Sequence, residues 1–411
     1  MLQLGIIGAG FIAGFQTRAM LQVRGVEVAG ILKRRRAEAL ARYCRDSGLG
    51  EAGIYGSVRE LAEHTDVLAI YAPNTIRVEL MEEIVEAVKA GAQLKGVICE
   101  KPLARNVREA RRLVDLAREV GLPTAYFENQ VYMGPVVSQR AQLAPVQRAM
   151  GPMTLVRSAE EHSGPHEAWF WDPVRQGGGV LSDMGCHSIA VGRYLLTPAG
   201  QDPLFLQPVS VQANLALLKW GQPKYQGQLK DRFGLDYKKT PAEDFATGSI
   251  RYRNPQTGQE TIAQFTNSWM FDMVGLRLLM EGLGPGYSFE FNTLRSPLTV
   301  FVGDEAAESI ADAETAMEKS TASRGLIAVH YNEADIYGYT DENRDMVRAF
   351  SEGREATFNW EFGLETIRLV MAAYMAHELG RTIDLTDPKV NEELESYVPL
   401  IQQGKGAELL Y

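Results

Sequence analysis

Residues 4–13 read LGIIGAGFIA, and this stretch decides the fold of the first part of the chain. A short apolar run ends at Gly8 and a helical pattern begins at Phe11, so the glycines occupy a turn between a strand and a helix. In that context the spacing Gly8-x-Gly10-x-x-Ala13 is a dinucleotide-binding fingerprint. Gly8 permits the tight turn, Gly10 lets the backbone approach a pyrophosphate, and Ala13 lets helix and strand pack closely.

The helix that begins at Phe11 also predicts an anion site. The first N–H groups of a helix, here including those of Phe11 and Ile12, have no partner within the helix and carry a partial positive charge. They would face the phosphates of a dinucleotide. The alternative is a glycine turn in an α/β fold that binds no cofactor.

The first 130 residues alternate strand and helix patterns. The predicted strands are residues 4–7, 26–32, 54–55, 67–71, 97–99 and 124–127. The predicted helices are residues 11–23, 35–46, 58–64, 76–90 and 107–120. This alternation indicates βαβ units, so residues 1–129 are predicted to form a Rossmann domain with a doubly wound parallel sheet. Ligands of such sheets bind beyond the carboxyl ends of the strands.

Beyond residue 130 the pattern changes to longer alternating stretches. Strands are predicted at residues 153–159, 209–218, 245–252, 261–269, 276–281 and 298–302, and helices at 341–352 and 362–379. The polar residues 221–243 are predicted to form a long loop. We therefore expect residues 130–411 to be an α+β domain with a large, mostly antiparallel open sheet that binds substrate. An open sheet face often pairs with its copy, so a homo-oligomer, dimer or tetramer, is expected.

The composition restricts the class of protein. The 411 residues include 42 Lys and Arg against 52 Asp and Glu, a net charge of −10, which argues against a nucleic-acid partner. The three cysteines have no CxxC spacing, so neither a disulfide framework nor a zinc site is expected. No stretch of 18 apolar residues predicts a membrane span, and the apolar start lacks the basic region of a signal peptide. These features predict a cytoplasmic protein.

A basic run follows the second predicted strand. That strand ends at Lys33 and continues as Lys33-Arg34-Arg35-Arg36. An NAD enzyme usually carries an acidic residue near this point, whereas a cation can pair with the 2′-phosphate of NADP. We therefore expect NADP, held in part by Lys33 and Arg34, with NAD as the alternative. The run could also be a solvated helix start.

Two further motifs carry candidate chemistry. Glu100-Lys101-Pro102 stands at the carboxyl end of a predicted central strand, and residues 177–187 read GGGVLSDMGCH. Asp183 and His187 are four residues apart and would share one helix face. A histidine near neutral pKa suits removal of a hydroxyl proton, and a lysine stabilises developing alkoxide charge. The alternatives are a charged strand end, a surface pair or a metal site; with no third ligand nearby, no metal is expected.

Together these motifs resemble the Gfo/Idh/MocA family of oxidoreductases, whose pattern is a Rossmann fingerprint, then Glu-Lys-Pro, then a glycine run with Asp-x-Gly-x-His. Pro73-Asn74 is similar to the family's Pro-Asn turn, although Arg77 replaces its histidine and leaves a cofactor contact that is changed in kind. The resemblance implies that Lys101 contacts the reacting hydroxyl and the nicotinamide ribose. It implies that His187 is the acid/base. It also implies that Asp183 binds substrate and tunes Lys101 and His187.

The resemblance implies hydride transfer between NAD(P) and a secondary hydroxyl of a sugar, sugar derivative or cyclitol. An NAD-dependent glycosidase of the same fold and a non-enzymatic, dinucleotide-responsive regulator are the alternatives. Trp169 and Trp171 precede the glycine run, and aromatic faces often pack on sugar rings, so both are candidate substrate contacts. Equally, they could be core aromatics. His162 and His166, in a polar loop nearby, could line the pocket or be solvated.

Overall fold

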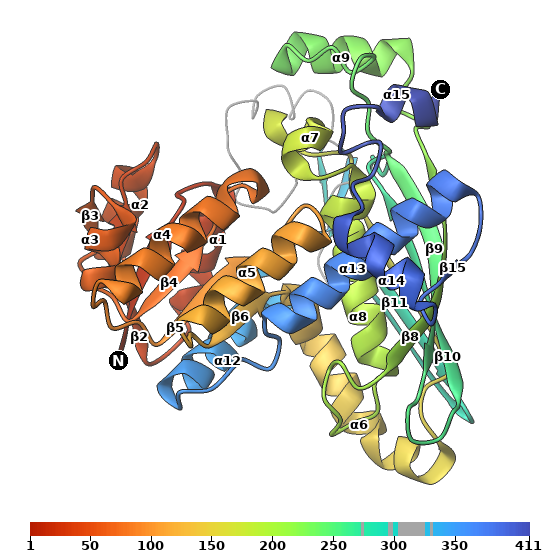
Figure 1. Ribbon diagram of the computed structural model, residues 1–411, viewed down its shortest axis with the longest axis horizontal. Coiled ribbons are helices and arrows are strands. Elements are labelled where there is room, and N and C mark those ends of the chain that lie inside the picture. The colour runs from red at the N-terminus through yellow and green to blue at the C-terminus, as the bar shows by residue number, and fades with distance from the viewer. Residues whose placement is uncertain (273–274, 295–298, 303–324, 329–331) are drawn as a thin grey trace. The chain divides into compact units, whose positions relative to one another are not determined.

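The alternating pattern at the start of the chain forms a six-stranded sheet in the order β3-β2-β1-β4-β5-β6 (Figure 1). The strands are β1 (Leu2–Ile7), β2 (Val26–Leu32), β3 (Gly53–Tyr55), β4 (Val67–Ile70), β5 (Gly96–Glu100) and β6 (Thr124–Phe127). All neighbouring strands are parallel. The order reverses between β1 and β4, where ligands bind in doubly wound folds, and the predicted Rossmann fold is confirmed.

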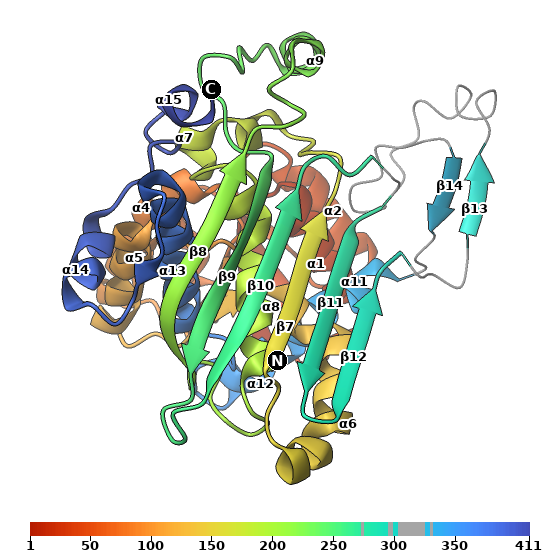
Figure 2. The same cartoon turned by 90° about the vertical axis from the view of Figure 1, so that its right-hand side faces the viewer.

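A second, larger sheet has the order β12-β11-β7-β10-β9-β8-β15 and is seen face-on in Figure 2. Its strands are β7 (Leu155–Glu161), β8 (Gln207–Ala216), β9 (Phe245–Arg253), β10 (Glu260–Ser268), β11 (Arg277–Gly284), β12 (Tyr287–Asn292) and β15 (Ile383–Asp384). Only the β7–β10 pair is parallel; the other five pairs are antiparallel. The predicted mostly antiparallel sheet is therefore confirmed.

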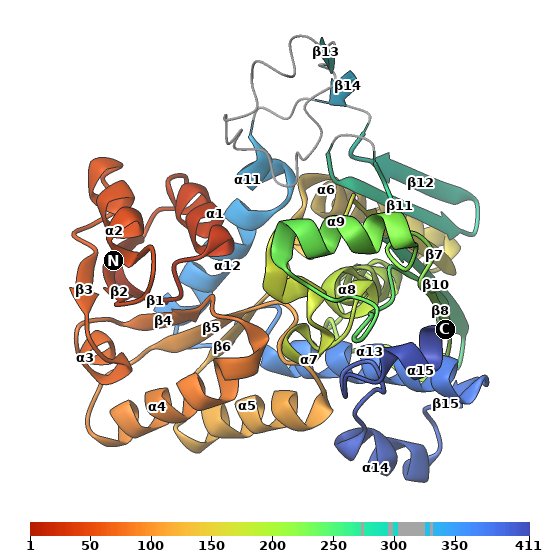
Figure 3. The same cartoon turned by 90° about the horizontal axis from the view of Figure 1, so that it is seen from above.

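Helices cover both faces of the parallel sheet. They are α1 (Phe11–Met20), α2 (Ala37–Asp46), α3 (Val58–Glu63), α4 (Arg77–Lys89) and α5 (Val107–Glu119). Figure 3 shows α4 and α5 on one face and α1 and α2 on the other. The start of α5 illustrates how the sequence sets an element, because the Asn106 side chain accepts the Glu109 N–H at 3.1 Å. A polar cap followed by a buried apolar stripe is the signal of an amphipathic helix.

The structure is a computed structural model that describes residues 1–272, 275–294, 299–302, 325–328 and 332–411. They form one unit of Met1–Gly134 with Ala334–Ile367, and another of Pro135–Glu333 with Arg368–Tyr411. The predicted boundary at residues 129 and 130 placed all later residues in the second domain. In the structure, α12 (Tyr339–Ser351) and the start of α13 (Trp360–Leu379) instead complete the first unit.

Specific contacts hold this returning segment, which also contains all but the first residue of α11 (Glu333–Ile336), on the first unit. The Trp360 indole donates to the carbonyl of Ala125 in β6 at 3.1 Å. The Phe350 ring packs where a side chain at Gly96 of β5 would stand, 2.6 Å from the position of its Cβ. The segment therefore buries apolar side chains against the sheet, and its helical period alone could not indicate which domain it covers.

Among the described residues, the remaining helices, apart from short turns, lie beyond residue 133. They are α6 (Gly134–Met150), α7 (Pro173–Gln176), α8 (Cys186–Leu196), α9 (Pro223–Phe233), α14 (Pro388–Ser396) and α15 (Gly406–Leu410). Helix α8 is buried almost throughout and packs on β7 and β10. It is the element that covers one face of the large sheet next to the glycine run.

Two predictions beyond residue 130 need correction. Residues 221–243 are not a continuous loop, because α9 begins at Pro223 and ends at Gly234 in the left-handed conformation. Its one buried residue, Leu229, gave too weak an apolar period to indicate a helix. The strand predicted at 298–302 appears as β13 (Thr299–Val302), which pairs with β14 (Gly325–Ala328) rather than with the large sheet. Leu298 lies outside the described residues.

Gly338, just before α12, tests the docking of the returning segment. Its φ is +87°, and a Cβ there would lie 2.2 Å from the Asn129 carbonyl oxygen. Gly353 has φ +69°, but among the described residues its Cβ would meet no atom within 4 Å. We expect Gly353→Ala to cost about 1 kcal/mol of unfolding free energy, from left-handed backbone strain alone.

Gly338→Ala should cost about 1–3 kcal/mol more than that control, because backbone must also move to relieve the overlap. Urea-induced unfolding followed by circular dichroism measures both. Equal losses for the two variants would show that the close approach to Asn129 does not hold the segment.

Candidate active site

The glycine turn lies at the point where the strand order of the first sheet reverses. Gly8 has φ +107°, and a Cβ there would lie 2.8 Å from the carbonyl carbon of Tyr71, at the end of β4. Gly10 is exposed, and among the described residues nothing stands within 4 Å of where its Cβ would be. Ala13 is fully buried in the core. Each position thus has the environment that the fingerprint requires.

The start of α1 fits a pyrophosphate. Gly10 caps the helix without a side-chain hydrogen bond, and the first turn carries no acidic residue. Phe11 is exposed and Ile12 half-buried, so this end of the helix faces solvent. A helix end without a competing side-chain acceptor or a negative charge favours a bound anion. The residues present therefore fit the phosphates of NAD(P).

The basic run is presented to solvent at the end of β2. The Lys33 N–H continues the β2–β3 pairing by donating to the Tyr55 carbonyl at 2.8 Å. The side chains of Lys33, Arg34, Arg35 and Arg36 are exposed. These cations lie at the carboxyl edge of the parallel sheet, the edge where ligands of this fold bind.

Arg77 does not face solvent. Its side chain is buried at the start of α4, and its guanidinium donates to the carbonyls of Ala72 (3.0 Å), Glu100 (2.6 Å) and Pro102. These bonds link the ends of β4 and β5, which gives the arginine a positioning role for the backbone on either side of Lys101. In the neighbouring turn, Pro73 is exposed and Asn74 is buried.

Lys101 is half-buried among buried carboxyl groups of the first unit. Burial raises the pKa of Glu100 to about 7 and that of Glu128 to about 8, while the nearby Lys101 charge acts to lower both. Gln16 bridges Glu100 and Glu342 through its amide nitrogen, at 2.7 and 2.8 Å. Lys101 therefore has the carboxyl groups of Glu100 and Glu128 as near neighbours. A lysine that carries its proton is the form that stabilises an alkoxide.

In the second unit, the glycine run packs against a buried carboxylate. Both oxygens of Glu243 accept the Gly179 N–H at 3.1 Å, and Oε1 also accepts the Leu181 N–H and the Tyr374 hydroxyl, at 3.0 and 2.7 Å. A Cβ at Gly179 would lie 2.2 Å from the Glu243 carbonyl oxygen, and one at Gly178 would lie 2.0 Å from the Tyr374 hydroxyl. Contacts within the protein therefore require glycine at positions 178 and 179.

Asp183 and His187 follow the run on one continuous helical segment. Asp183 lies in the π-helical turn η4 (Leu181–Gly185) and His187 in the first turn of α8. Both side chains are buried, with 2% and 3% exposed. A π-helical turn inside a helix is frequent at functional sites and keeps residues four apart on one side. The turn packs on β7, β9 and β10.

The two candidate tryptophans have different surroundings. Trp169, in η3 (Ala168–Trp171), is half-buried and stacks on Phe170 with ring centroids 3.9 Å apart. Trp171 is buried and donates through Nε1 to the Pro165 carbonyl at 3.0 Å. His162 is also buried, and its Nδ1 accepts the Gly164 N–H at 2.9 Å.

The structure brings the predicted residues together as two groups. The dinucleotide turn, the basic run and Lys101 belong to the first unit, and Asp183, His187 and the tryptophans belong to the second. That Lys101 meets Asp183 and His187 at a nicotinamide remains a prediction.

Within the described residues, no cluster of three or more His, Cys, Asp and Glu has the arrangement of a metal site. No described helix combines the length and low charge that a bilayer span requires.

Sequence reasoning missed the residues that position the second group. Glu243 and Tyr374 contact the glycine run from 64 and 195 residues further along the chain. Asp244 accepts three consecutive backbone N–H groups, those of Leu218, Lys219 and Trp220. The one local signal was a pair of adjacent acidic residues immediately before an apolar strand, where buried carboxylates need such partners.

Glu243 predicts a pH dependence of stability. Burial raises the pKa of this carboxyl from its ordinary 4.5 to about 7, so the folded state binds the proton more tightly than the unfolded state. This contribution to stability is complete below pH 4.5 and is lost as the pH rises through 7. Glu243→Gln, which keeps an acceptor oxygen but cannot ionise, should lack it. The unfolding free energy of wild type minus that of the variant should fall by about 3 kcal/mol between pH 4.5 and 8.

Urea titrations at several pH values measure this difference, with the exposed Glu83→Gln as the matched control. Glu243→Ala should be less stable at every pH, because the N–H groups of Gly179 and Leu181 lose their acceptor. A difference between wild type and Glu243→Gln that does not change with pH would contradict the assignment.

Comparisons with known proteins identify the chain's relatives. Residues 2–127 match the profile of the Gfo/Idh/MocA oxidoreductase family with an NAD-binding Rossmann fold, and residues 139–279 match the C-terminal domain of the same family. A 1,5-anhydro-D-fructose reductase from Ensifer adhaerens is 28% identical over 269 residues, 62% of this chain and 77% of the reductase. A D-glucoside 3-dehydrogenase from Escherichia coli is 28% identical over 258 residues, 62% and 67% of the two chains.

Solved structures share the fold. GenD2 from gentamicin A biosynthesis, in complex with NAD, has a TM-score of 0.71 at 20% identity and covers 93% of this chain and 96% of its own. A myo-inositol dehydrogenase from Corynebacterium glutamicum has a TM-score of 0.66 at 17% identity and covers 94% of this chain and 99% of its own. At these identities the likeness concerns the fold alone. Because the two family profiles cover more than half of its length, the chain belongs to the Gfo/Idh/MocA family of oxidoreductases.

Proposed function

We propose that this protein transfers a hydride between NAD(P) and a secondary hydroxyl of a sugar, sugar derivative or cyclitol. The observation that carries the proposal is the pairing of a complete dinucleotide turn with Lys101, held among carboxyl groups at the carboxyl end of β5. Family membership supports it, and so do the names of the reductase and the glucoside dehydrogenase described above. Substrates of doubly wound folds bind at that edge of the sheet.

The chain's own residues divide the proton chemistry. The nicotinamide, when bound, supplies the hydride acceptor. Lys101 donates a hydrogen bond to the reacting hydroxyl and stabilises the alkoxide as it forms. His187 takes the hydroxyl proton on its imidazole, and Asp183, four residues before it, orients the ring and binds substrate. Glu243 and Tyr374 fix the backbone that carries this pair, so they act by positioning.

For the cofactor, we propose NADP over NAD. Lys33 and Arg34 lie directly after β2 with exposed side chains, where an acidic residue would bind the ribose hydroxyls of NAD. A guanidinium or ammonium group pairs with the 2′-phosphate instead. Gly8, Gly10, Phe11, Ile12 and Ala13 shape the pyrophosphate site, with Pro73 and Asn74 at the adjacent turn after β4.

We also propose a homo-oligomer that uses the open face of the large sheet. Helix α8 covers one face of this sheet. A concavity of about 480 Å³ lies across strands β7 to β11 and is lined by polar and charged side chains such as Arg157, Gln264 and Glu281. A broad surface of this kind suits pairing with a second copy of the chain.

Lys101→Ala tests the proposed chemistry. Removing the ammonium group should lower kcat at least about 100-fold, because developing alkoxide charge then lacks its stabilising cation. Cofactor affinity should change by less than about tenfold. The assay follows dinucleotide reduction spectrophotometrically with a panel of sugars and cyclitols, and fluorescence titration measures NADPH binding.

Lys95→Ala is the matched control, since Lys95 is exposed and pairs with Asp66 in the same unit. It should retain wild-type turnover. Full activity of Lys101→Ala would refute the catalytic role of Lys101, and loss of cofactor binding together with activity would place its role in the cofactor site alone.

Lys33→Asp tests the cofactor preference. An aspartate at this position repels a 2′-phosphate and accepts hydrogen bonds from the ribose hydroxyls. The ratio of kcat/KM for NADP to that for NAD should fall at least about tenfold. Arg59→Asp, a charge reversal at another exposed position, on α3, should leave the ratio unchanged. An unchanged ratio in Lys33→Asp would show that the basic run is only solvated.

A further inference from the structure

A cavity of about 690 Å³ lies within the second unit, at the end of the large sheet where β7, β8 and β10 finish and β9 begins. Its walls come from the segments that follow those three strands and from α9. Glu243, just before β9, holds the glycine run that leads to Asp183 and His187. The cavity and the proposed proton-transfer pair are therefore built on the same end of the sheet.

Aromatic rings form much of the wall. The Trp220 ring contacts Trp171 edge-on at a centroid distance of 4.7 Å and Tyr225 at 5.6 Å. Trp171 is buried and Trp220 and Tyr225 are half-buried, and all three line the cavity. Ligand pockets of about 300–1,000 Å³ combine apolar and aromatic side chains with placed polar groups. This cavity has both kinds of lining. Aromatic faces of this kind suit the C–H surface of a sugar ring.

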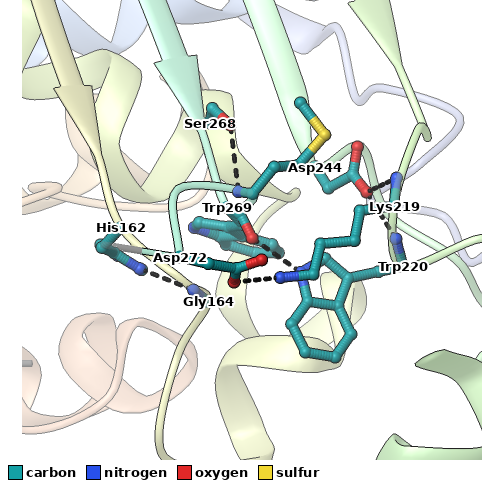
Figure 4. Close-up of polar contacts among 9 residues, drawn as sticks. His162, Gly164, Lys219, Trp220, Asp244, Ser268, Trp269 and Asp272 are labelled. Carbon is teal, nitrogen blue, oxygen red and sulfur yellow. Dashed lines mark hydrogen bonds and ion pairs between the residues drawn. The ribbon is translucent and has the colours of Figure 1, made fainter. Parts of the chain in front are cut away.

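The ring of Trp220 is fixed in place without a ligand. Its Nε1 donates to the Trp269 carbonyl at 2.8 Å, and its backbone N–H donates to Asp244 at 2.7 Å (Figure 4). The adjacent Lys219 N–H donates to the same carboxylate at 2.8 Å. A wall that is already ordered loses little conformational entropy on binding, so the cavity is preorganised.

The charged groups of the cavity balance. Lys219, with 12% of its side chain exposed, forms an ion pair with Asp272, and its Nζ lies 5.0 Å from the centroid of Trp220 (Figure 4). Asp231 and Arg232 of α9 add one charge of each sign to the lining. With two cations against two anions, the cavity offers hydrogen-bonding groups without a net charge. This favours a neutral, hydroxyl-rich ligand over a phosphate or a carboxylate.

We propose that this cavity is a subsite for the second, non-reacting sugar ring of a glycoside. That ring stacks on the indole of Trp220, and its hydroxyls bond to Lys219 and Asp272. The inference rests on the proposed function and narrows the substrate class, from free sugars and cyclitols to compounds in which a further ring is joined to the oxidised one.

Binding of one-ring and two-ring ligands tests the subsite. Methyl β-D-glucopyranoside and methyl β-D-galactopyranoside serve as one-ring probes, and cellobiose, maltose and lactose as two-ring probes. Isothermal titration calorimetry is run with NADPH present, which cannot accept a hydride. At least one disaccharide should bind about tenfold more tightly than the one-ring probes. Trp220→Ala should remove that advantage while changing one-ring affinity less than about twofold.

Two controls separate stacking from folding. Trp220→Phe keeps an aromatic face and should keep most of the advantage. Lys230→Ala changes an exposed side chain of α9 outside the cavity lining and should behave as wild type. The subsite would be overturned if Trp220→Ala lowered the affinity for one-ring and two-ring probes equally. It would also be overturned if no disaccharide bound more tightly than the one-ring probes. Tightest binding of glucose 6-phosphate, lost in Lys219→Ala, would identify an anion site instead.

The outcome also separates this inference from the proposed function. Trp220-dependent disaccharide binding by a protein that reduces no dinucleotide would leave the subsite standing and refute the oxidoreductase assignment. Turnover of one-ring sugars, with no Trp220-dependent increase in affinity from a second ring, would refute the subsite and leave the oxidoreductase assignment standing.

Discussion

The second unit depends on two consecutive buried carboxylates, Glu243 and Asp244. Successive side chains of an extended backbone point to opposite sides, so the pair serves two segments at once. Glu243 receives the N–H groups of the glycine run, and Asp244 receives those of residues 218–220. A buried carboxylate without partners is strongly destabilising, so the surrounding backbone must converge on both. The loop that leads to Asp183 and the wall of the aromatic cavity are consequently set by one dipeptide.

The parts of the site that the sequence could predict are those determined locally. Gly8, Gly10 and Ala13 each have an environment fixed by the adjoining strand and helix, so their spacing alone was informative. Asp183 and His187 were likewise placed on one helix by a four-residue interval. The long strands of the second sheet were recognisable because one face is buried and the other is not.

The parts that it could not predict depend on distant partners. Gly178 and Gly179 are glycines because Tyr374 and Glu243 occupy the space of their side chains, a reason that only the folded chain contains. The sequence suggests Arg77 as a cofactor contact, yet its guanidinium donates to carbonyls at the ends of two strands. Helix α9 has a single buried side chain, so its terminal Pro223 and Gly234, rather than periodicity, mark its bounds.

The returning segment Ala334–Ile367 means that the first unit is completed only late in synthesis. Domains generally fold in order from the N-terminus as the chain emerges. Here β5 and β6 leave the ribosome more than 230 residues before Phe350 and Trp360, the side chains that pack on them. Until that stretch leaves the ribosome, an apolar strip of the first sheet stays uncovered. A fragment cut at residue 129 would keep that strip permanently, and the recombinant half-protein would be prone to self-association.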